Sequence, residues 1–130
     1  MVEWAKFNKK TLQRHNLWAT GTTGTIIEKA LEDVPVTKVM SGPLGGDQQI
    51  GAMIANGEID VVIFLWDPLE AHPHDVDVKA LLRIAAVHNI IIACDRSTAD
   101  FVLSSPLMGK EYEIMLRDYV GYENRFLEEE

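Results

Sequence analysis

The segment Ser41-Gly42-Pro43-Leu44-Gly45-Gly46-Asp47-Gln48-Gln49 combines a glycine-rich turn with an acid at the start of a helix. Residues 36–40 before it have the character of a short strand, and Ile50, Met53 and Ile54 after it recur at helical spacing. In a strand, turn and helix of this kind, backbone N–H groups can gather around an anion. The helix macrodipole also keeps an acid at this position ionised, so that it can accept a proton. The segment therefore predicts an anion site beside a base.

Two further turns follow strand-like runs, Thr20 to Gly24 and Trp66 to Asp77. The carboxyl ends of parallel strands meet at one edge of a sheet, and ligands of α/β folds bind beyond that edge. We therefore expect all three turns to meet there and to form the functional site.

The rest of the chain alternates strand and helix patterns through short loops. Helices are predicted at residues 2–14, around 26–31, at 47–56 with Gly57 at the C′ position, at 77–87, after a capping box at 97–100, and at 119–130. Strands are predicted at 16–19, 36–40, 60–65, 90–94 and 112–116. This alternation predicts an α/β fold, a three-layer doubly wound domain with a mainly parallel sheet. A length of 130 residues fits a single domain.

Composition narrows the function classes. A net charge of -8 argues against nucleic acid as a partner. The longest apolar runs are far too short to span a membrane, and residues 1–4 do not resemble a signal peptide. Cys94 is the one cysteine, which fits a cytoplasmic protein, and its apolar strand predicts that it is buried filler rather than a nucleophile.

The turn from Thr20 to Gly24 is a candidate phosphate cradle, because glycines let the backbone approach an anion and threonine hydroxyls add donors. An ordinary strand-to-helix turn with threonine as N-cap explains it equally well. Ser41-Gly42 belongs to a second donor-rich turn, and two such turns after neighbouring strands can hold one phosphate from two sides. Neither turn is a Walker motif, because the Gly-Lys-Ser/Thr ending is missing.

Three acids, Asp47, Asp67 and Asp77, are expected near this edge. Asp47 is either a helix cap or a general base. Asp77 is either a helix cap or an acid of the site, and Asp67 either stabilises the turn before Pro68 or is an acid of the site. His74 beside these acids is a candidate proton shuttle. His72, His74 and Asp75 resemble metal ligands in composition, but no cysteine or more distant histidine completes the set, and we predict no metal site.

Together these residues resemble the methylglyoxal synthase family. The segments that carry the resemblance are Ala19–Gly24, Ser41–Gly51, Phe64–Leu69, Pro73–Arg83 and Thr98–Phe101. The second and fourth of them are specific to the family, and the likeness runs from about residue 2 to the C-terminal helix.

The resemblance implies a lyase that converts dihydroxyacetone phosphate to methylglyoxal and inorganic phosphate without a metal or organic cofactor. By the family's pattern, Asp47 removes a proton alpha to the carbonyl and His74 hydrogen-bonds the enediolate oxygens, with Asp77 and Asp67 as acidic companions. The positions that hold phosphate are Thr20, Thr22, Thr23, Ser41 and Gly42.

The resemblance also implies a homohexamer, inhibition by phosphate, and an arginine that reaches the phosphate of a neighbouring subunit, for which Arg125 is the nearest candidate. One departure stands out. The family begins with a further strand, central in the sheet, that ends in a His-Asp pair followed by a lysine, and this chain starts after it. We therefore expect a single domain over residues 1–130 that is N-terminally incomplete, with unpaired backbone groups on the neighbouring strands.

Two alternatives share this fold class. A regulatory domain that binds a phosphorylated effector needs the threonine and glycine turns, but it does not need Asp47, His74 and Asp77 together. A nucleotide-cyclising domain related to purine synthesis fits the run from Gly45 to Gln49 less well than the synthase does.

Overall fold

The computed structural model describes residues 1–70 and 75–116. Its strands are β1 (Leu17–Ala19), β2 (Val36–Lys38), β3 (Val61–Ile63) and β4 (Ile91–Ala93). Its α-helices are α1 (Val2–Phe7), α2 (Lys9–Leu12), α3 (Gly21–Leu31), α4 (Gly46–Ala55), α5 (Asp75–Val87) and α6 (Arg96–Ser104). Two short 3₁₀ turns, η1 (Gly42–Leu44) and η2 (Pro106–Gly109), complete the elements.

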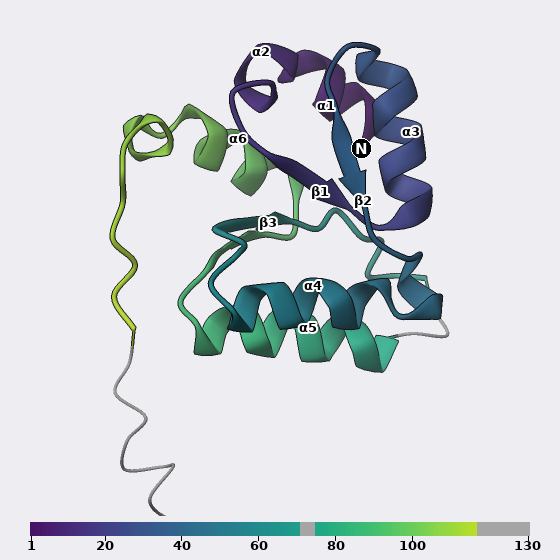
Figure 1. Ribbon diagram of the computed structural model, residues 1–130, viewed down its shortest axis with the longest axis vertical. Helices are drawn as coiled ribbons and strands as arrows, with labels where there is room; N and C mark the ends of the chain where they lie inside the picture. Colours follow the sequence, from purple (N-terminus) through teal and green to yellow (C-terminus); the bar gives the residue numbers. More distant parts are fainter. Residues whose placement is uncertain (71–74, 117–130) are drawn as a thin grey trace, which may run out of the picture.

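The helices cover the strands from two sides, as the predicted three-layer architecture requires (Figure 1). Helices α4 and α5 form one layer, and α1, α2, α3 and α6 form the other. Residues along β3 alternate between the two layers: Val62 belongs to the cluster with α4 and α5, whereas Ile63 packs against the cluster that contains Trp4. This alternation follows from the two-residue period of a strand covered on both faces.

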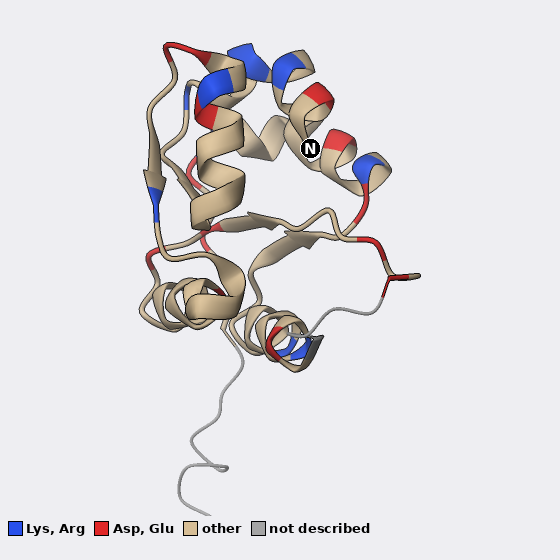
Figure 2. Cartoon of the chain, turned by 90° about the vertical axis from the view of Figure 1, so that its right-hand side faces the viewer, with Lys and Arg blue, Asp and Glu red and all other residues tan. Residues whose placement is uncertain are grey.

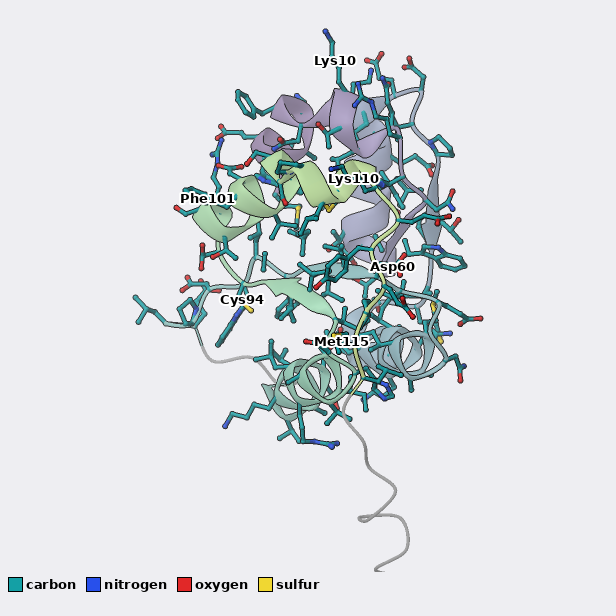
Figure 3. All side chains as sticks on the ribbon, turned by 90° about the vertical axis from the view of Figure 1, so that its left-hand side faces the viewer. Lys10, Asp60, Cys94, Phe101, Lys110 and Met115 are labelled. Carbon is teal, nitrogen blue, oxygen red and sulfur yellow. The ribbon has the colours of Figure 1, made fainter. Side chains whose placement is uncertain are left out.

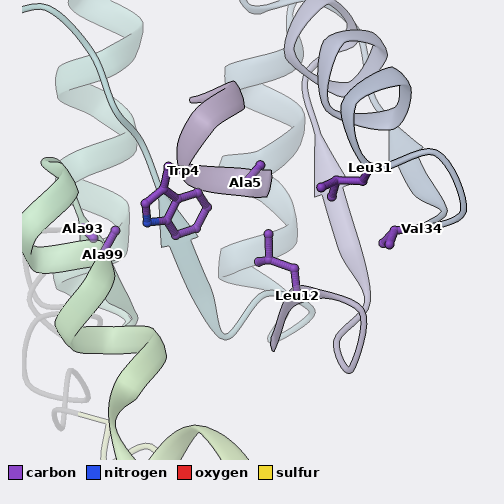
Figure 4. Close-up of a cluster of buried hydrophobic side chains, with 7 residues drawn as sticks. All are labelled: Trp4, Ala5, Leu12, Leu31, Val34, Ala93 and Ala99. Carbon is purple, nitrogen blue, oxygen red and sulfur yellow. The ribbon is translucent and has the colours of Figure 1, made fainter. Parts of the chain in front are cut away.

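Two buried clusters hold the layers together. The first joins α1, α2, α3, β4 and α6 and is shown in Figure 4; its members are Trp4, Ala5, Leu12, Leu31, Val34, Ala93 and Ala99. The second joins α4, β3 and α5 through Ile54, Val62, Leu81 and Ala85. Trp4 also donates a hydrogen bond from Nε1 to Asp100 Oδ1 at 3.0 Å, which ties α1 to α6.

The strands form two parallel pairs in the described part of the chain, rather than the one sheet that the alternation suggested. β1 pairs with β2, with Ala19 opposite Lys38, and β3 pairs with β4, with Ile63 opposite Ala93. A cavity between the pairs is lined by β1 and β3. In the described part of the chain, β1 and β3 therefore each have a strand neighbour on one side only.

Several predicted boundaries shift. The predicted helix over 2–14 is two helices that break at Asn8, whose side chain donates to the Trp4 carbonyl. The helix predicted after a capping box at 97–100 begins earlier, because the Asp95 side chain accepts the Thr98 N–H at 2.7 Å and is the N-cap.

The strand predicted at 112–116 is absent, and Tyr112, Met115 and Leu116 are exposed. The predicted helix over 119–130 lies outside the described residues. Gly57 does follow α4 with a positive φ of 76°, as its predicted C′ position requires. Within the described ranges, no helix is long and apolar enough to cross a bilayer.

Candidate active site

The turns after β1 and β2 lie side by side because their strands pair in parallel. Backbone hydrogen bonds continue past the strand ends: the Val39 N–H donates to the Ala19 carbonyl at 2.9 Å, and the Gly21 N–H donates to the Met40 carbonyl at 3.3 Å. The two predicted anion-binding turns are therefore joined by main-chain contacts, which do not depend on side-chain identity.

The first turn is the start of a helix. Thr20 is the backbone N-cap of α3, but its side chain makes no capping hydrogen bond. The Gly24 N–H donates to the Thr20 carbonyl at 2.7 Å, so Thr22 and Thr23 lie in the first turn, where helix geometry supplies no carbonyl partner for their N–H groups. Such first-turn amides are suitable donors to an anion.

The second turn is folded tightly around Ser41. The Ser41 carbonyl accepts the N–H groups of Leu44, at 3.0 Å, and Gly46, at 2.9 Å. Gly45 has a φ of 112°, which favours glycine, and a Cβ at buried Gly46 would overlap the Met40 carbonyl oxygen. Both glycines are thus explained by geometry, and they bring the start of α4 directly against the end of β2.

Asp47 lies in the first turn of α4 and is only 6% exposed. Among the described residues it is the only charged residue that is buried. It lines a cavity of about 560 Å³ together with Thr20 and Thr23. The structure therefore brings the predicted base and the threonine turn to one cavity, although they are separated by more than one strand and helix in the sequence.

The walls of this cavity are mostly apolar, with Leu17 and Ala19 of β1 facing the same space as Val61 and Ile63 of β3. Arg14 also lines it, but Arg14 precedes β1 whereas Thr20 follows it. Figure 2 shows basic residues on several elements, among them α1, α2 and β2. The Lys38 side chain of β2 lies next to Gly24 of the threonine turn, but its Nζ pairs with Glu28 at 3.3 Å. An anion at the threonine turn would thus be held mainly by oriented amides and hydroxyls rather than by a described cation.

The other two predicted acids do not line the Asp47 cavity. Asp67 is exposed, and its Oδ1 accepts the Leu69 N–H at 2.9 Å, which is the turn interaction considered for an Asp before proline. It lines a second cavity of about 990 Å³ with Trp66 and Cys94. Asp77 is half-buried and lines neither cavity; because α5 begins at Asp75, the interpretation of Asp77 as the helix cap was wrong.

The remaining predicted residues are placed as follows. Ser41 and Gly42 are half-buried in the tight turn, and Thr22 is exposed. His72, His74 and Arg125 lie outside the described residues, so their roles stay predictions. Among the residues that the structure does describe, no group of three or more histidines, cysteines and acids could hold a metal ion.

Cys94 follows β4 and is half-buried rather than fully buried (Figure 3). Burial raises the pKa of its thiol, and the nearby Asp95 carboxylate raises that pKa further, whereas a hydrogen bond with Trp66 lowers it. A raised pKa keeps the group as a thiol near neutral pH, which agrees with the prediction that it is not a nucleophile.

Gln49 belongs to the family-specific segment, but its contact in the site was not predicted. Its side-chain Oε1 accepts the Met40 N–H at 2.8 Å. A glutamine in a helix has many possible partners, so only the fold reveals this contact.

Comparison with known proteins places this geometry in a family. Residues 1–94 match the family model described as an MGS-like domain. A methylglyoxal synthase of Coxiella burnetii (strain Dugway 5J108-111) is 56% identical over 127 residues, which cover 98% of this chain and 88% of the relative. A methylglyoxal synthase of Saccharophagus degradans is 58% identical over 122 residues, 94% of this chain and 79% of the relative.

A solved structure agrees with these matches. The crystal structure of methylglyoxal synthase from Elizabethkingia anophelis NUHP1 superposes with a TM-score of 0.90 at 57% sequence identity, covering 95% of this chain and 81% of the other. At this identity the likeness extends to the sequence as well as to the fold.

Proposed function

The chain belongs to the methylglyoxal synthase family, and from this premise we propose that it converts dihydroxyacetone phosphate to methylglyoxal and inorganic phosphate with Asp47 as the base. The observation that carries the assignment of Asp47 is its burial in the cavity that Thr20 and Thr23 also line. A carboxylate and a set of first-turn amides at one cavity can act on the two ends of one small phosphorylated substrate.

The reaction needs two linked steps. The Asp47 carboxylate accepts the proton from the carbon alpha to the carbonyl, and the electron pair of that C–H bond forms an enediolate. The enediolate then expels phosphate as the C–O bond breaks, and the resulting enol tautomerises to methylglyoxal. The low exposure of Asp47 limits the access of bulk water to the base during the first step.

The leaving group carries the largest charge in the substrate. Helices α3 and α4 both begin at this edge, and the partial positive charges of their N-termini favour an anion there, together with the Thr22 and Thr23 N–H groups of α3. These donors are fixed by the backbone contacts around Met40 before substrate arrives, so little reorganisation is needed when charge develops on the phosphate.

The finer assignments are also proposals. His74 hydrogen-bonds the enediolate oxygens, Asp77 and Asp67 are its acidic companions, and the phosphate is held by Thr20, Thr22, Thr23, Ser41 and Gly42, with Arg125 supplied from a neighbouring subunit. The protein acts in the cytoplasm as a homohexamer that inorganic phosphate inhibits. Asp67 lines a different cavity from Asp47, so its role requires the two cavities to be joined when substrate is bound.

The test compares Asp47→Asn with Asp33→Asn, a surface change at an acid that pairs with Lys9. Loss of a general base lowers turnover by about 10²- to 10⁴-fold, so we expect methylglyoxal formation by Asp47→Asn to fall by at least 100-fold. Phosphate affinity should stay within a few-fold of the parent, and Asp33→Asn should behave like the parent. Near-normal turnover by Asp47→Asn would reject Asp47 as the base.

We also propose that one more parallel strand completes the sheet by occupying the part of the cavity that Leu17–Ala19 and Val61–Ile63 line, which leaves the end at Thr20, Thr23 and Asp47 open to the substrate. The cavity is lined by residues of both strands, and each strand has its described strand neighbour on one side only. Adjacent strands lie about 4.8 Å apart, so a strand in this position would satisfy both facing edges at once. Its apolar walls predict an apolar strand.

Hydrogen exchange tests this second proposal. The chain is compared with a version that carries an additional apolar strand at its N-terminus, and with the chain mixed with the same strand as a separate peptide. We expect slower amide exchange in Leu17–Ala19 and Val61–Ile63 and a higher turnover in the extended version. Unchanged exchange and equal turnover in all three samples would show that the cavity takes no strand.

A further inference from the structure

Met40 connects two parts of the candidate site through its backbone, although its side chain is exposed. Its carbonyl accepts the N–H of Gly21, the first residue of α3, at 3.3 Å. Its N–H donates to the side-chain Oε1 of Gln49, in α4, at 2.8 Å. The peptide groups of one residue therefore join the helix that starts at the threonine turn to the helix that carries Asp47.

Gln49 supplies an acceptor that the sheet does not. The Val39 N–H still donates to the Ala19 carbonyl, but Met40 lies two residues beyond the end of β2. Its N–H has no strand carbonyl as a partner in the described chain and donates to Gln49 Oε1 instead. The Gln49 carboxamide oxygen takes the place of a strand carbonyl there.

The same contact restrains the rotation of α4. The Gln49 backbone N–H donates to the Gly45 carbonyl at 3.0 Å, so Gln49 belongs to the first hydrogen-bonded turn of the helix. Asp47 is two residues earlier, which places it about 200° around the helix axis. A rotation of α4 that turned Asp47 away from its cavity would therefore also pull Gln49 away from Met40.

We propose that Gln49 is a positioning residue: it fixes the orientation of Asp47 relative to the threonine turn by holding the Met40 peptide. This rests on the proposed function in so far as Asp47 is the base and the threonine turn holds phosphate. Gln49 is exposed, so water can replace the lost acceptor and the fold tolerates its removal. The consequence of losing the contact is a less precise site rather than an unfolded protein.

The test uses Gln49→Met, which keeps the length of the side chain but lacks the acceptor, and Gln49→Glu, which keeps an acceptor oxygen. Gln48→Met, at the exposed neighbouring position, is the matched control. We expect Gln49→Met to lower kcat about tenfold with a change in KM below threefold. Gln49→Glu should recover kcat to within about threefold of the parent, with a raised KM because its charge repels the substrate phosphate.

Two readouts separate this proposal from the proposed function. Amide exchange at Met40 should accelerate about fivefold in Gln49→Met, the effect of about 1 kcal/mol from one hydrogen bond, but not in Gln48→Met. Binding of inorganic phosphate should change by less than threefold in Gln49→Met, in line with its KM. Both hold even if Asp47 is not the base. Unchanged Met40 exchange, or a Gln49→Glu variant as impaired in kcat as Gln49→Met, would overturn the positioning role.

Discussion

Gly46→Ala tests whether the start of α4 must lie directly against the end of β2. A Cβ at this buried position would overlap the Met40 carbonyl oxygen and would lie 2.9 Å from the Met40 carbonyl carbon and 3.0 Å from that of Ser41. Ordinary Cβ contacts begin at 3.4 Å, so α4 and the Ser41 turn must separate by about 0.5 Å or more. All three neighbours are backbone atoms, which cannot swing aside as a side chain can.

The expected cost is about 1–3 kcal/mol in the free energy of unfolding, the usual range for an extra methyl group in a packed site. Displacement of Asp47 from the threonine turn should also lower kcat/KM, since a shift of about 1 Å can cost about 100-fold. Urea unfolding and steady-state rates of methylglyoxal formation measure the two effects.

Gly51→Ala is the matched control, because Gly51 lies in the same helix and a Cβ there would meet only Ile84 Cγ2, at 3.8 Å. Alanine is the better helix former by about 1 kcal/mol, so this variant should be as stable as the parent or more so, with normal activity. A Gly46→Ala variant that matched Gly51→Ala in stability and rate would refute the close approach of α4 to Met40.

Three further predictions concern α6 and its surroundings. The Thr98 N–H and hydroxyl donate to Asp95 and lower the pKa of its carboxyl, so the stabilisation by Asp95 should be present above about pH 4 and lost as the pH falls through the lowered pKa. Melting temperatures measured between about pH 2 and 6 should depend less on pH in Asp95→Asn than in the parent. Parallel curves for the two proteins would contradict this prediction. Burial is the main cause of the raised pKa of Cys94, and the Asp95 charge is the second cause. The rate of alkylation of the folded protein should therefore have its pH midpoint above the ordinary thiol pKa, and Asp95→Asn should lower that midpoint. An unchanged midpoint in Asp95→Asn would show that the carboxylate does not act on the thiol. Trp4→Phe should lower the free energy of unfolding by about 2 kcal/mol, because the hydrogen bond from buried Trp4 to the Asp100 side chain is lost. Asp100→Asn keeps an acceptor and should lower it by less. Equal losses of unfolding free energy for the two variants in chemical denaturation would count against the hydrogen bond as the cause.

Local signals in the sequence predicted most of the elements. The helix that ends before Gly57 is an example: the Gly57 N–H donates to the Ile54 carbonyl at 3.1 Å and the Glu58 N–H donates to that of Met53 at 2.9 Å, a C-cap that needs no partner from elsewhere in the fold. The turn at Gly45-Gly46 was likewise visible, because a positive φ and a close backbone approach both require glycine.

Features that depend on distant partners were harder to predict. The apolar run at 112–116 resembles a strand, but a strand exists only where another offers its backbone, and here Asn89 Nδ2 donates to the Met115 carbonyl instead. The start of α6 was predicted too late, because the sequence offers two possible N-caps close together. The capping box at 97–100 was preferred, whereas Asp95 is the N-cap and accepts the Thr98 N–H. The division into two strand pairs and the contact between Gln49 and Met40 both follow from tertiary geometry that no local pattern encodes.

The candidate site shows the same division. The association of Asp47 with Thr20 and Thr23 followed from the expectation that turns after parallel strands share an edge, and they do line one cavity. The expectation that Asp67 would join them treated the turn after β3 in the same way. However, Asp67 lines a second cavity instead, with Trp66 and Cys94.

A crystal structure of Asp47→Asn with dihydroxyacetone phosphate bound would show whether residue 47 and the threonine turn act on one substrate molecule. We expect the phosphate to be held by the first-turn amides of Thr22 and Thr23 and by the Ser41 turn, with the reacting carbon about 3–3.5 Å from the residue 47 side chain. A phosphate bound elsewhere, or a reacting carbon out of reach of residue 47 while the phosphate occupies the threonine turn, would contradict this expectation.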